Sequence, residues 1–320
     1  MEPMKAVPPP WTARWLLRRW RLILVATVAL ALGLALALVP WPEVGEAIGA
    51  ARVSFLLAAV ALNLAVFPFW VWQWQLIAAP LARVDWRTMS GVVALSVTAK
   101  VALSGVAGLS SGLLALRYRA GLSYSEAGTV ISVDQFFALV TKVAVIGLAL
   151  LLLPLPAVVL QAALGLAALS GLMLAVLWLA GPPGHRPLPV DHRLQLPFRA
   201  VRRFLNDLAA LRSWPVLAGG LALALIKKAL ETGAALAVQL ACGIEASPAA
   251  AVLVVAAVSL TTLVPVAPAN LGIHSAGVFA AYALLDTPTD QAIAAGLLHH
   301  AMLLVASVLA ALSGLWLARR

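Results

Sequence analysis

Eight long apolar segments recur along the chain, and they restrict its fold more than any other feature. They cover residues 20–39, 53–78, 89–114, 127–153, 157–180, 214–241, 248–284 and 290–318. About 20 consecutive apolar residues form a helix long enough to cross the hydrocarbon core of a bilayer. With 63% hydrophobic and 11% charged residues, the chain has more apolar surface than a soluble domain can bury. We therefore expect an all-α integral membrane protein, a single membrane domain over residues 1–320.

Two of the eight segments differ from ordinary membrane spans. Segment 89–114 is interrupted by small and polar residues, among them Lys100. Segment 248–284 is too long for one crossing, and it contains residues that stop a helix or reverse the chain: Pro265, Pro268, Asn270 and Gly272. Prolines three residues apart end an α-helix, and Gly adopts the backbone conformations of a tight reversal. These breaks favour a reversal of the chain, with a simple kink as the alternative.

The distribution of basic residues separates the two topologies. Cytoplasmic loops of membrane proteins are rich in Lys and Arg. If both interrupted segments are re-entrant hairpins, the loop 181–213 and both termini lie in the cytoplasm. Of the Lys and Arg residues between the segments, only Arg52 then lies on the outer side of the membrane. If all eight segments cross, Arg117 and Arg119 move to the outer side. We therefore predict about six full transmembrane helices plus two re-entrant helical hairpins, in a multi-pass protein of the cytoplasmic membrane.

This topology has an internal symmetry. Residues 20–153 and 157–318 contain the same four elements in opposite orientation. Inverted repeats with broken helices at corresponding positions are typical of transporters, whose binding site lies where the broken segments meet. The sequence therefore predicts an inverted repeat with a midplane site.

Charged residues within apolar segments are candidates for function, because a charge at the bilayer centre is costly. Glu231 follows Lys228 by three residues and Lys227 by four, so its carboxylate can reach either ammonium group on one helix face. One carboxylate cannot neutralise two lysines, and an uncompensated cation would attract a lipid phosphate. A self-satisfied ion pair is the alternative.

Segment 127–153 contributes Asp134, Gln135 and Lys142. Asp134 and Lys142 are about 12 Å apart along a helix, so they interact only through a bridging group. Lys100 lies in the first arm of the cytoplasmic hairpin, where it faces a polar cavity or extends toward the membrane surface.

The histidines allow two interpretations. His299 and His300 point about 100° apart on a helix, so we expect at most one of them to face a given site. A proton-linked role and a hydrogen bond to a neighbouring helix are both open. His274 is isolated in sequence, and no spacing of ligands indicates a metal site. Cys242 is the only cysteine, which excludes an intramolecular disulfide.

Two motifs indicate a family. Residues 117–127 read RYRAGLSYSEA, and residues 265–272 read PVAPANLG. With Asp290-Gln-Ala292 and Gly314-Leu-Trp316, they resemble the lysylphosphatidylglycerol synthase transmembrane, or flippase-like, family. The resemblance implies a flippase-type fold and the handling of amphipathic lipids. Members with a soluble aminoacyl-transfer domain make lysyl-lipid, and no such domain is present up to Arg320.

The chain also departs from the family pattern. In the family, an acidic residue usually follows shortly after the glycine that corresponds to Gly272, but Ile273-His274-Ser275 stand there in this chain. His299-His300 stand near the position of an Arg that is common in the last span of the family. These departures leave the specific lipid open.

We expect a lipid flippase-like transporter for an anionic lipid, without a catalytic residue, metal or cofactor. The expected partners are membrane lipids, together with a second copy of the chain or a lipid-modifying enzyme. We do not expect nucleic acid as a partner, because the positive-inside rule accounts for the net charge of +10. The alternatives are a membrane enzyme acting on a lipid head group and a non-catalytic partner of such an enzyme. The predicted head-group site consists of Lys100, Arg117, Asp134, Gln135, Lys142, Lys227, Lys228, Glu231, Pro265, Pro268, Asn270, Gly272, His274, His299 and His300.

Overall fold

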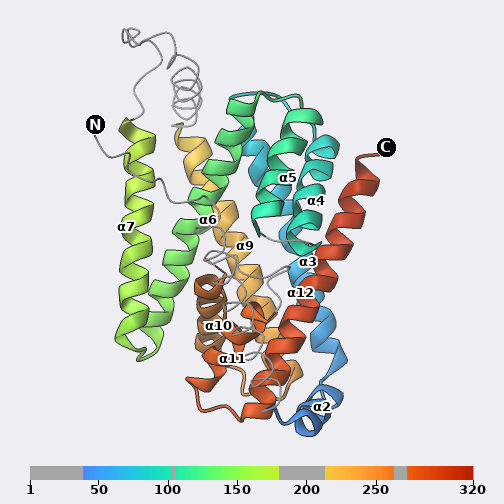
Figure 1. The fold of residues 1–320 in the computed structure, drawn as a ribbon, viewed down its shortest axis with the longest axis vertical. Helices are drawn as coiled ribbons and strands as arrows, with labels where there is room; N and C mark the ends of the chain where they lie inside the picture. Colours follow the sequence, from blue (N-terminus) through green and yellow to red (C-terminus); the bar gives the residue numbers. More distant parts are fainter. Residues whose placement is uncertain (1–38, 103–104, 180–212, 263–271, 320) are drawn as a thin grey trace, which may run out of the picture.

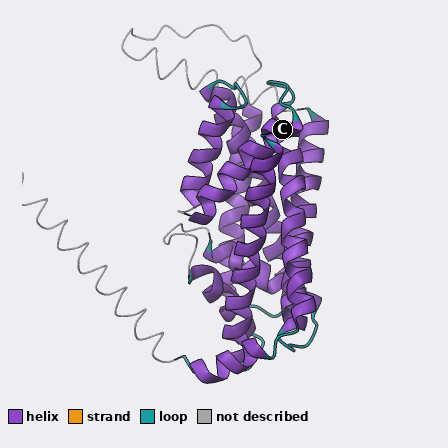
Figure 2. Cartoon of the chain, turned by 90° about the vertical axis from the view of Figure 1, so that its right-hand side faces the viewer, coloured by secondary structure: helices purple, strands orange, loops and turns teal. Residues whose placement is uncertain are grey.

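The computed structural model describes residues 39–102, 105–179, 213–262 and 272–319 (Figure 1). Within these ranges all regular structure is helical. The helices are α2 (Trp41–Gly49), α3 (Val53–Ala78), α4 (Trp86–Ala102), α5 (Gly105–Tyr118), α6 (Tyr124–Leu152), α7 (Ala157–Leu179), α9 (Trp214–Ala241), α10 (Pro248–Thr261), α11 (Ile273–Ala283) and α12 (Thr289–Leu317). Figure 2 shows the long helices running in nearly the same direction in one bundle.

Four of these helices are long and apolar enough to cross a membrane: Val53–Ala78, Tyr124–Leu152, Ala157–Ala175 and Thr289–Leu317. Many large apolar side chains on the bundle are exposed, Leu151 by 85% for example. Such a surface is stable against lipid and not against water. The prediction of an all-α, multi-pass membrane protein is therefore confirmed.

Helix α9 has 28 residues, which gives it a length of about 42 Å. It differs from the four apolar helices because Lys227, Lys228 and Glu231 lie near its middle. All three side chains are only partly exposed. The helix is thus long enough to cross a bilayer, and its charges lie against neighbouring helices.

Several predicted boundaries agree with the structure. The apolar segments 53–78 and 214–241 coincide with α3 and α9, and the segments that became α6, α7 and α12 differ by at most a few residues. The short helix α2, which packs against α12, was not predicted. Almost all of segment 20–39 and of the loop 181–213 lies outside the described residues.

The first interrupted segment forms two antiparallel helices, α4 and α5. The Ser96 hydroxyl donates a hydrogen bond to the Gly108 carbonyl oxygen at 2.8 Å, and the Ser111 hydroxyl donates one to the Leu95 carbonyl oxygen at 3.3 Å. A Cβ atom on Gly108 would lie 2.7 Å from Lys100 Cβ, so the two backbones approach closely because this residue has no side chain. The small and polar residues in segment 89–114 therefore allow α4 and α5 to pack closely against each other.

The second interrupted segment also forms two helices, α10 and α11, which pack together. A Cβ atom on Gly277 of α11 would lie 2.7 Å from the Thr261 hydroxyl of α10. Gly272 precedes α11 and has a φ angle of 79°, a conformation that favours glycine. This agrees with the predicted reversal, although Pro265, Pro268 and Asn270 lie outside the described residues. In Figure 1 the α4–α5 pair lies in the upper half of the bundle and the α10–α11 pair in the lower half.

Candidate functional site

An ion pair between α6 and α9 lies inside the bundle. Lys227 Nζ is 3.9 Å from Asp134 Oδ1, and the two side chains are 15% and 5% exposed. Gln135 Nε2 donates a hydrogen bond to the other Asp134 oxygen at 3.1 Å. The sequence did not predict this partner for Lys227, because the two residues are far apart along the chain.

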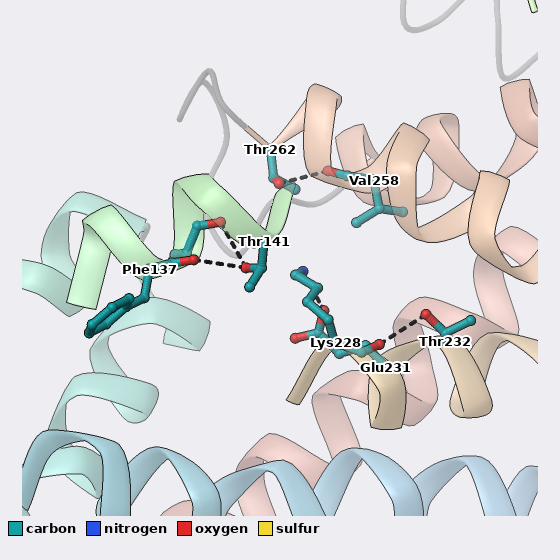
Figure 3. A network of polar contacts seen from close by, with 8 residues as sticks. Phe137, Thr141, Lys228, Glu231, Thr232, Val258 and Thr262 are labelled. Atoms are coloured by element: carbon teal, nitrogen blue, oxygen red, sulfur yellow. Dashed lines mark hydrogen bonds and ion pairs between the residues drawn. The ribbon is translucent and has the colours of Figure 1, made fainter. Parts of the chain in front are cut away.

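The neighbouring lysine is paired within its own helix. Lys228 Nζ lies 2.5 Å from Glu231 Oε2, as Figure 3 shows. The Thr232 hydroxyl donates a hydrogen bond to the Lys228 carbonyl oxygen at 2.9 Å. Of the two lysines that the spacing allowed as partners of Glu231, Lys228 is the one that forms the ion pair.

Two further lysines join this group. Lys100 at the end of α4 has Glu231, Lys228 and Asp134 as electrostatic neighbours. Lys142 on α6 has Lys228, Lys100 and Glu231. We use the name charged cluster for the six residues Lys100, Asp134, Lys142, Lys227, Lys228 and Glu231. The cluster brings together α4, α6 and α9, and with α4 it includes one of the two interrupted segments.

The charges of the charged cluster do not cancel. Its two carboxylates are engaged by Lys227 and Lys228, and among the described residues neither Lys100 nor Lys142 forms an ion pair. Lys100 is exposed and Lys142 half-buried, so a further molecule can reach them. The cluster thus has two positive charges in excess of its carboxylates.

The indole of Trp70 on α3 lies beside two of these lysines. Lys100 Nζ is 5.7 Å and Lys227 Nζ 5.5 Å from the centroid of its ring, which are distances of cation–π interactions. The Trp70 Nε1 atom is buried and has no hydrogen-bond partner in the described part of the chain. A buried N–H group without an acceptor is rare, so Trp70 Nε1 is a further donor near the charged cluster that a ligand acceptor would satisfy.

Three histidines lie next to the charged cluster. His274 Nε2 of α11 and His299 Nδ1 of α12 are 2.8 Å apart and share a hydrogen bond. The His274 ring stacks on both His299 and His300, with centroid distances of 5.1 and 4.8 Å. The expectation that at most one of the two adjacent histidines faces a given site was wrong, because the ring of His274 approaches from the neighbouring helix and contacts both.

The histidines connect electrostatically to the charged cluster. Glu231 is an electrostatic neighbour of His299, and Lys100 is one of His274. Within the described ranges, no three His, Cys, Asp or Glu side chains have the geometry to hold a metal ion. The second interrupted segment therefore reaches the charged cluster through His274.

The family of the chain follows from its comparison with known proteins. The family model described as lysylphosphatidylglycerol synthase TM region matches residues 20–311. The chain belongs to this family. Searches of curated proteins and of solved structures found no match. The resemblance predicted from the sequence is confirmed, and the family name relates this membrane protein to the synthesis of lysylphosphatidylglycerol.

In this member of the lysylphosphatidylglycerol synthase TM region family, the motif at residues 117–127 covers the C-terminal end of α5, the loop after it and the start of α6. Arg117 donates a hydrogen bond to the Leu122 carbonyl oxygen at 3.1 Å and lies 5.5 Å from the ring centroid of Tyr124. Ser123 and Glu126 form a capping box at the start of α6. The structure therefore places Arg117 in the last helical turn of α5, where it contacts the loop that leads to α6, and neither of these contacts is with the charged cluster.

The sequence reasoning missed Trp70, although a signal was present. Trp70 and Trp74 are four residues apart, which places them on the same face of α3, and their rings pack edge to face at 6.1 Å. Trp74 is fully buried. A tryptophan pair on one face of an otherwise apolar span indicates a contact inside the protein, because interfacial tryptophans lie at the ends of a span.

Proposed function

We propose that this chain moves an anionic amphipathic lipid across the cytoplasmic membrane, with the head group passing the charged cluster and the tails remaining in the bilayer. The observation that carries this proposal is the excess of two lysines over carboxylates, with Lys100 and Lys142 free of ion pairs in the described part of the chain. An anionic phosphate group would balance these charges.

Energetics favours an anionic ligand over an empty site. A single charge at the bilayer centre costs at least about 2.5–3.5 kcal/mol on insertion scales. An unpaired cation in a low-dielectric interior needs a counter-ion or water. Lys100 is exposed, and Trp70 Nε1 has no partner among the described residues. Both groups are hydrogen-bond donors that phosphate oxygens can accept from.

The proposed topology is six full transmembrane helices plus two re-entrant hairpins in an inverted repeat, with both termini in the cytoplasm. Helices α4, α5, α10 and α11 have 17, 14, 14 and 11 residues. They are therefore about 16–25 Å long, shorter than the hydrocarbon core of about 30 Å. Their lengths support two hairpins that approach the midplane from opposite faces, with Lys100 and His274 near the two inner ends.

A cavity gives the lipid tail a place beside the head-group site. It has a volume of about 450 Å³, within the usual range of ligand pockets, and lies between α6, α7 and α9. Its lining residues are Phe136, Phe137, Val140, Leu174, Trp214, Leu217, Ala218 and Leu221. Three of these residues, Phe136, Phe137 and Val140, lie between Asp134 and Lys142 along α6. The cavity and two residues of the charged cluster therefore belong to the same part of this helix.

Movement of labelled lipid in proteoliposomes tests the proposal. The purified protein is reconstituted with fluorescently labelled phosphatidylglycerol or phosphatidylcholine, and a membrane-impermeant quencher reports the label that reaches the outer leaflet. We expect the wild-type protein to move phosphatidylglycerol faster than phosphatidylcholine, and we expect Lys100→Gln/Lys142→Gln to lose this preference.

Arg83→Gln is the matched control, because it also removes a positive charge and Arg83 is exposed in the turn between α3 and α4. Equal movement of phosphatidylglycerol by the wild-type protein and the double lysine variant would contradict the assignment of the site. Recovery of chemically altered lipid would instead indicate the alternative function, an enzyme acting on the head group.

A further inference from the structure

The hydrogen bond between His274 and His299 leaves one ring nitrogen without a partner. Two neutral imidazoles share a proton between them, so one nitrogen of the 2.8 Å contact donates and the other accepts. In either arrangement His299 Nε2 is buried and lacks a hydrogen-bond partner among the described residues. It is then either a bare acceptor or an unpaired N–H group, and both cost free energy. The neutral pair therefore has an incomplete hydrogen-bond network.

Protonation of the pair depends on its burial first and on the charged groups around it second. The electrostatic neighbours of His299 are Glu231 on α9 and His300 on α12. Those of His274 are His299 and His300 on α12 and Lys100 on α4. Helices α3 and α10, which pack against α12 and α11, contain no charged or titratable residue, and the acidic residues of α2 are exposed. The charged neighbours of the histidine pair, Glu231 and Lys100, therefore both belong to the charged cluster.

An anion in the charged cluster changes the net charge around the pair. A head-group phosphate bound at Lys100 would neutralise the cation that opposes protonation of His274. The proton and the anion would then each strengthen binding of the other, because coupling between two sites is reciprocal. A carrier that changes its access mainly when both ligands are bound carries the two together.

We propose that His274 and His299 bind one proton together with the anionic head group, which makes this chain a proton–lipid symporter. This inference rests on the proposed lipid transport. The proton is taken from water on the side where the lipid enters and forms an N–H bond on the histidine pair. That bond breaks on the other side, where water accepts the proton as the lipid leaves. No other covalent bond changes.

Proteoliposomes with a pH gradient test the coupling. They contain labelled phosphatidylglycerol and an entrapped pH-sensitive dye, so lipid distribution and proton flux are read from the same sample. With one proton per lipid, a gradient of one pH unit shifts the lipid distribution toward the alkaline side by up to about tenfold. We expect His299→Gln and His274→Gln to abolish the shift and the lipid-dependent proton flux, because Gln forms hydrogen bonds and does not bind a proton at these pH values.

His192→Gln is the control, since it removes a histidine from the loop 181–213 and leaves the three histidines of α11 and α12 unchanged. Lipid movement that ignores the gradient, without proton flux, would overturn the coupling and leave the proposed transport intact. Proton flux opposite in direction to the lipid would overturn symport. Failure of the wild-type protein to move lipid would overturn both proposals. If one histidine variant does not fold, the other variant and the wild-type fluxes decide the question.

Discussion

Asp134 on α6 and Lys227 on α9 form an ion pair at 3.9 Å that joins the two halves of the chain inside the bundle. The predicted repeats, residues 20–153 and 157–318, each contribute one member of this pair. Gln73 Nε2 of α3 makes a second connection between the halves, since it donates a hydrogen bond to the Gly220 carbonyl oxygen at 2.8 Å. The charged cluster is thus formed only when the halves pack together.

The ion pair gives a first prediction on stability. Asp134→Asn leaves Lys227 buried without a carboxylate, which in a buried pair costs up to about 3–5 kcal/mol. We expect a clear fall in the midpoint of thermal unfolding in nanodiscs. In Asp134→Asn/Lys227→Gln both charges are gone, so this variant should unfold at a higher temperature than Asp134→Asn alone. Additive losses in this double-mutant cycle would show that the two side chains do not interact.

The close approach of α4 and α5 gives a second prediction. In Gly108→Ala the new Cβ atom would lie 2.7 Å from Lys100 Cβ and 3.0 Å from the Ser96 carbonyl oxygen. Because one of these atoms belongs to the backbone, the arms must separate, and we expect a loss of about 1–3 kcal/mol. Gly147→Ala on α6 is the control, since a Cβ atom there would meet nothing within 4 Å. Similar unfolding midpoints for the two variants would contradict this account of the hairpin.

Asp85 at the start of α4 gives a prediction on pH. It accepts hydrogen bonds from the Thr88 hydroxyl at 2.6 Å and from the Thr88 backbone N–H at 3.0 Å. These bonds, the hydroxyl first, hold the pKa of Asp85 below its ordinary value. The ionised cap therefore stabilises the folded chain above the ordinary pKa of about 3.9, and this contribution is lost as the pH falls through the lower folded value.

Asp85→Ala should accordingly lose about 1 kcal/mol or less at neutral pH, because the cap is exposed. We expect the difference between the wild-type protein and Asp85→Ala to decrease below about pH 4. Unfolding midpoints measured between neutral and acidic pH check this expectation. A difference that grows on acidification would have the wrong sign for a carboxylate cap.

The sequence predicted the helices well because their limits are local. Apolar length defined α3 and α9, and the predicted break in segment 248–284 agrees with a helix that begins after Gly272. The spacing of Lys228 and Glu231 predicted their ion pair, since residues three apart share a helix face. Each of these inferences needs only residues that are neighbours along the chain.

Contacts between helices could not be predicted in the same way. The partner of Lys227 is on α6, and His274 on α11 contacts both histidines of α12. Nothing in the spacing of these residues shows which helix faces which. Arg117 was included in the predicted site because of its motif. The structure places it in the last turn of α5, where its hydrogen bond to the Leu122 carbonyl oxygen supports the loop that leads to α6.

Retention of lipid by the purified protein tests the central claim, that the charged cluster holds an anionic head group. The protein is released from nanodiscs that contain equal amounts of phosphatidylglycerol and phosphatidylcholine, and native mass spectrometry counts the lipids that remain bound. We predict that the wild-type protein and Arg83→Gln retain phosphatidylglycerol in preference to phosphatidylcholine. We predict that Lys100→Gln/Lys142→Gln shows no preference between the two lipids. An unchanged preference in the double lysine variant, or no preference in the wild-type protein, would contradict the claim.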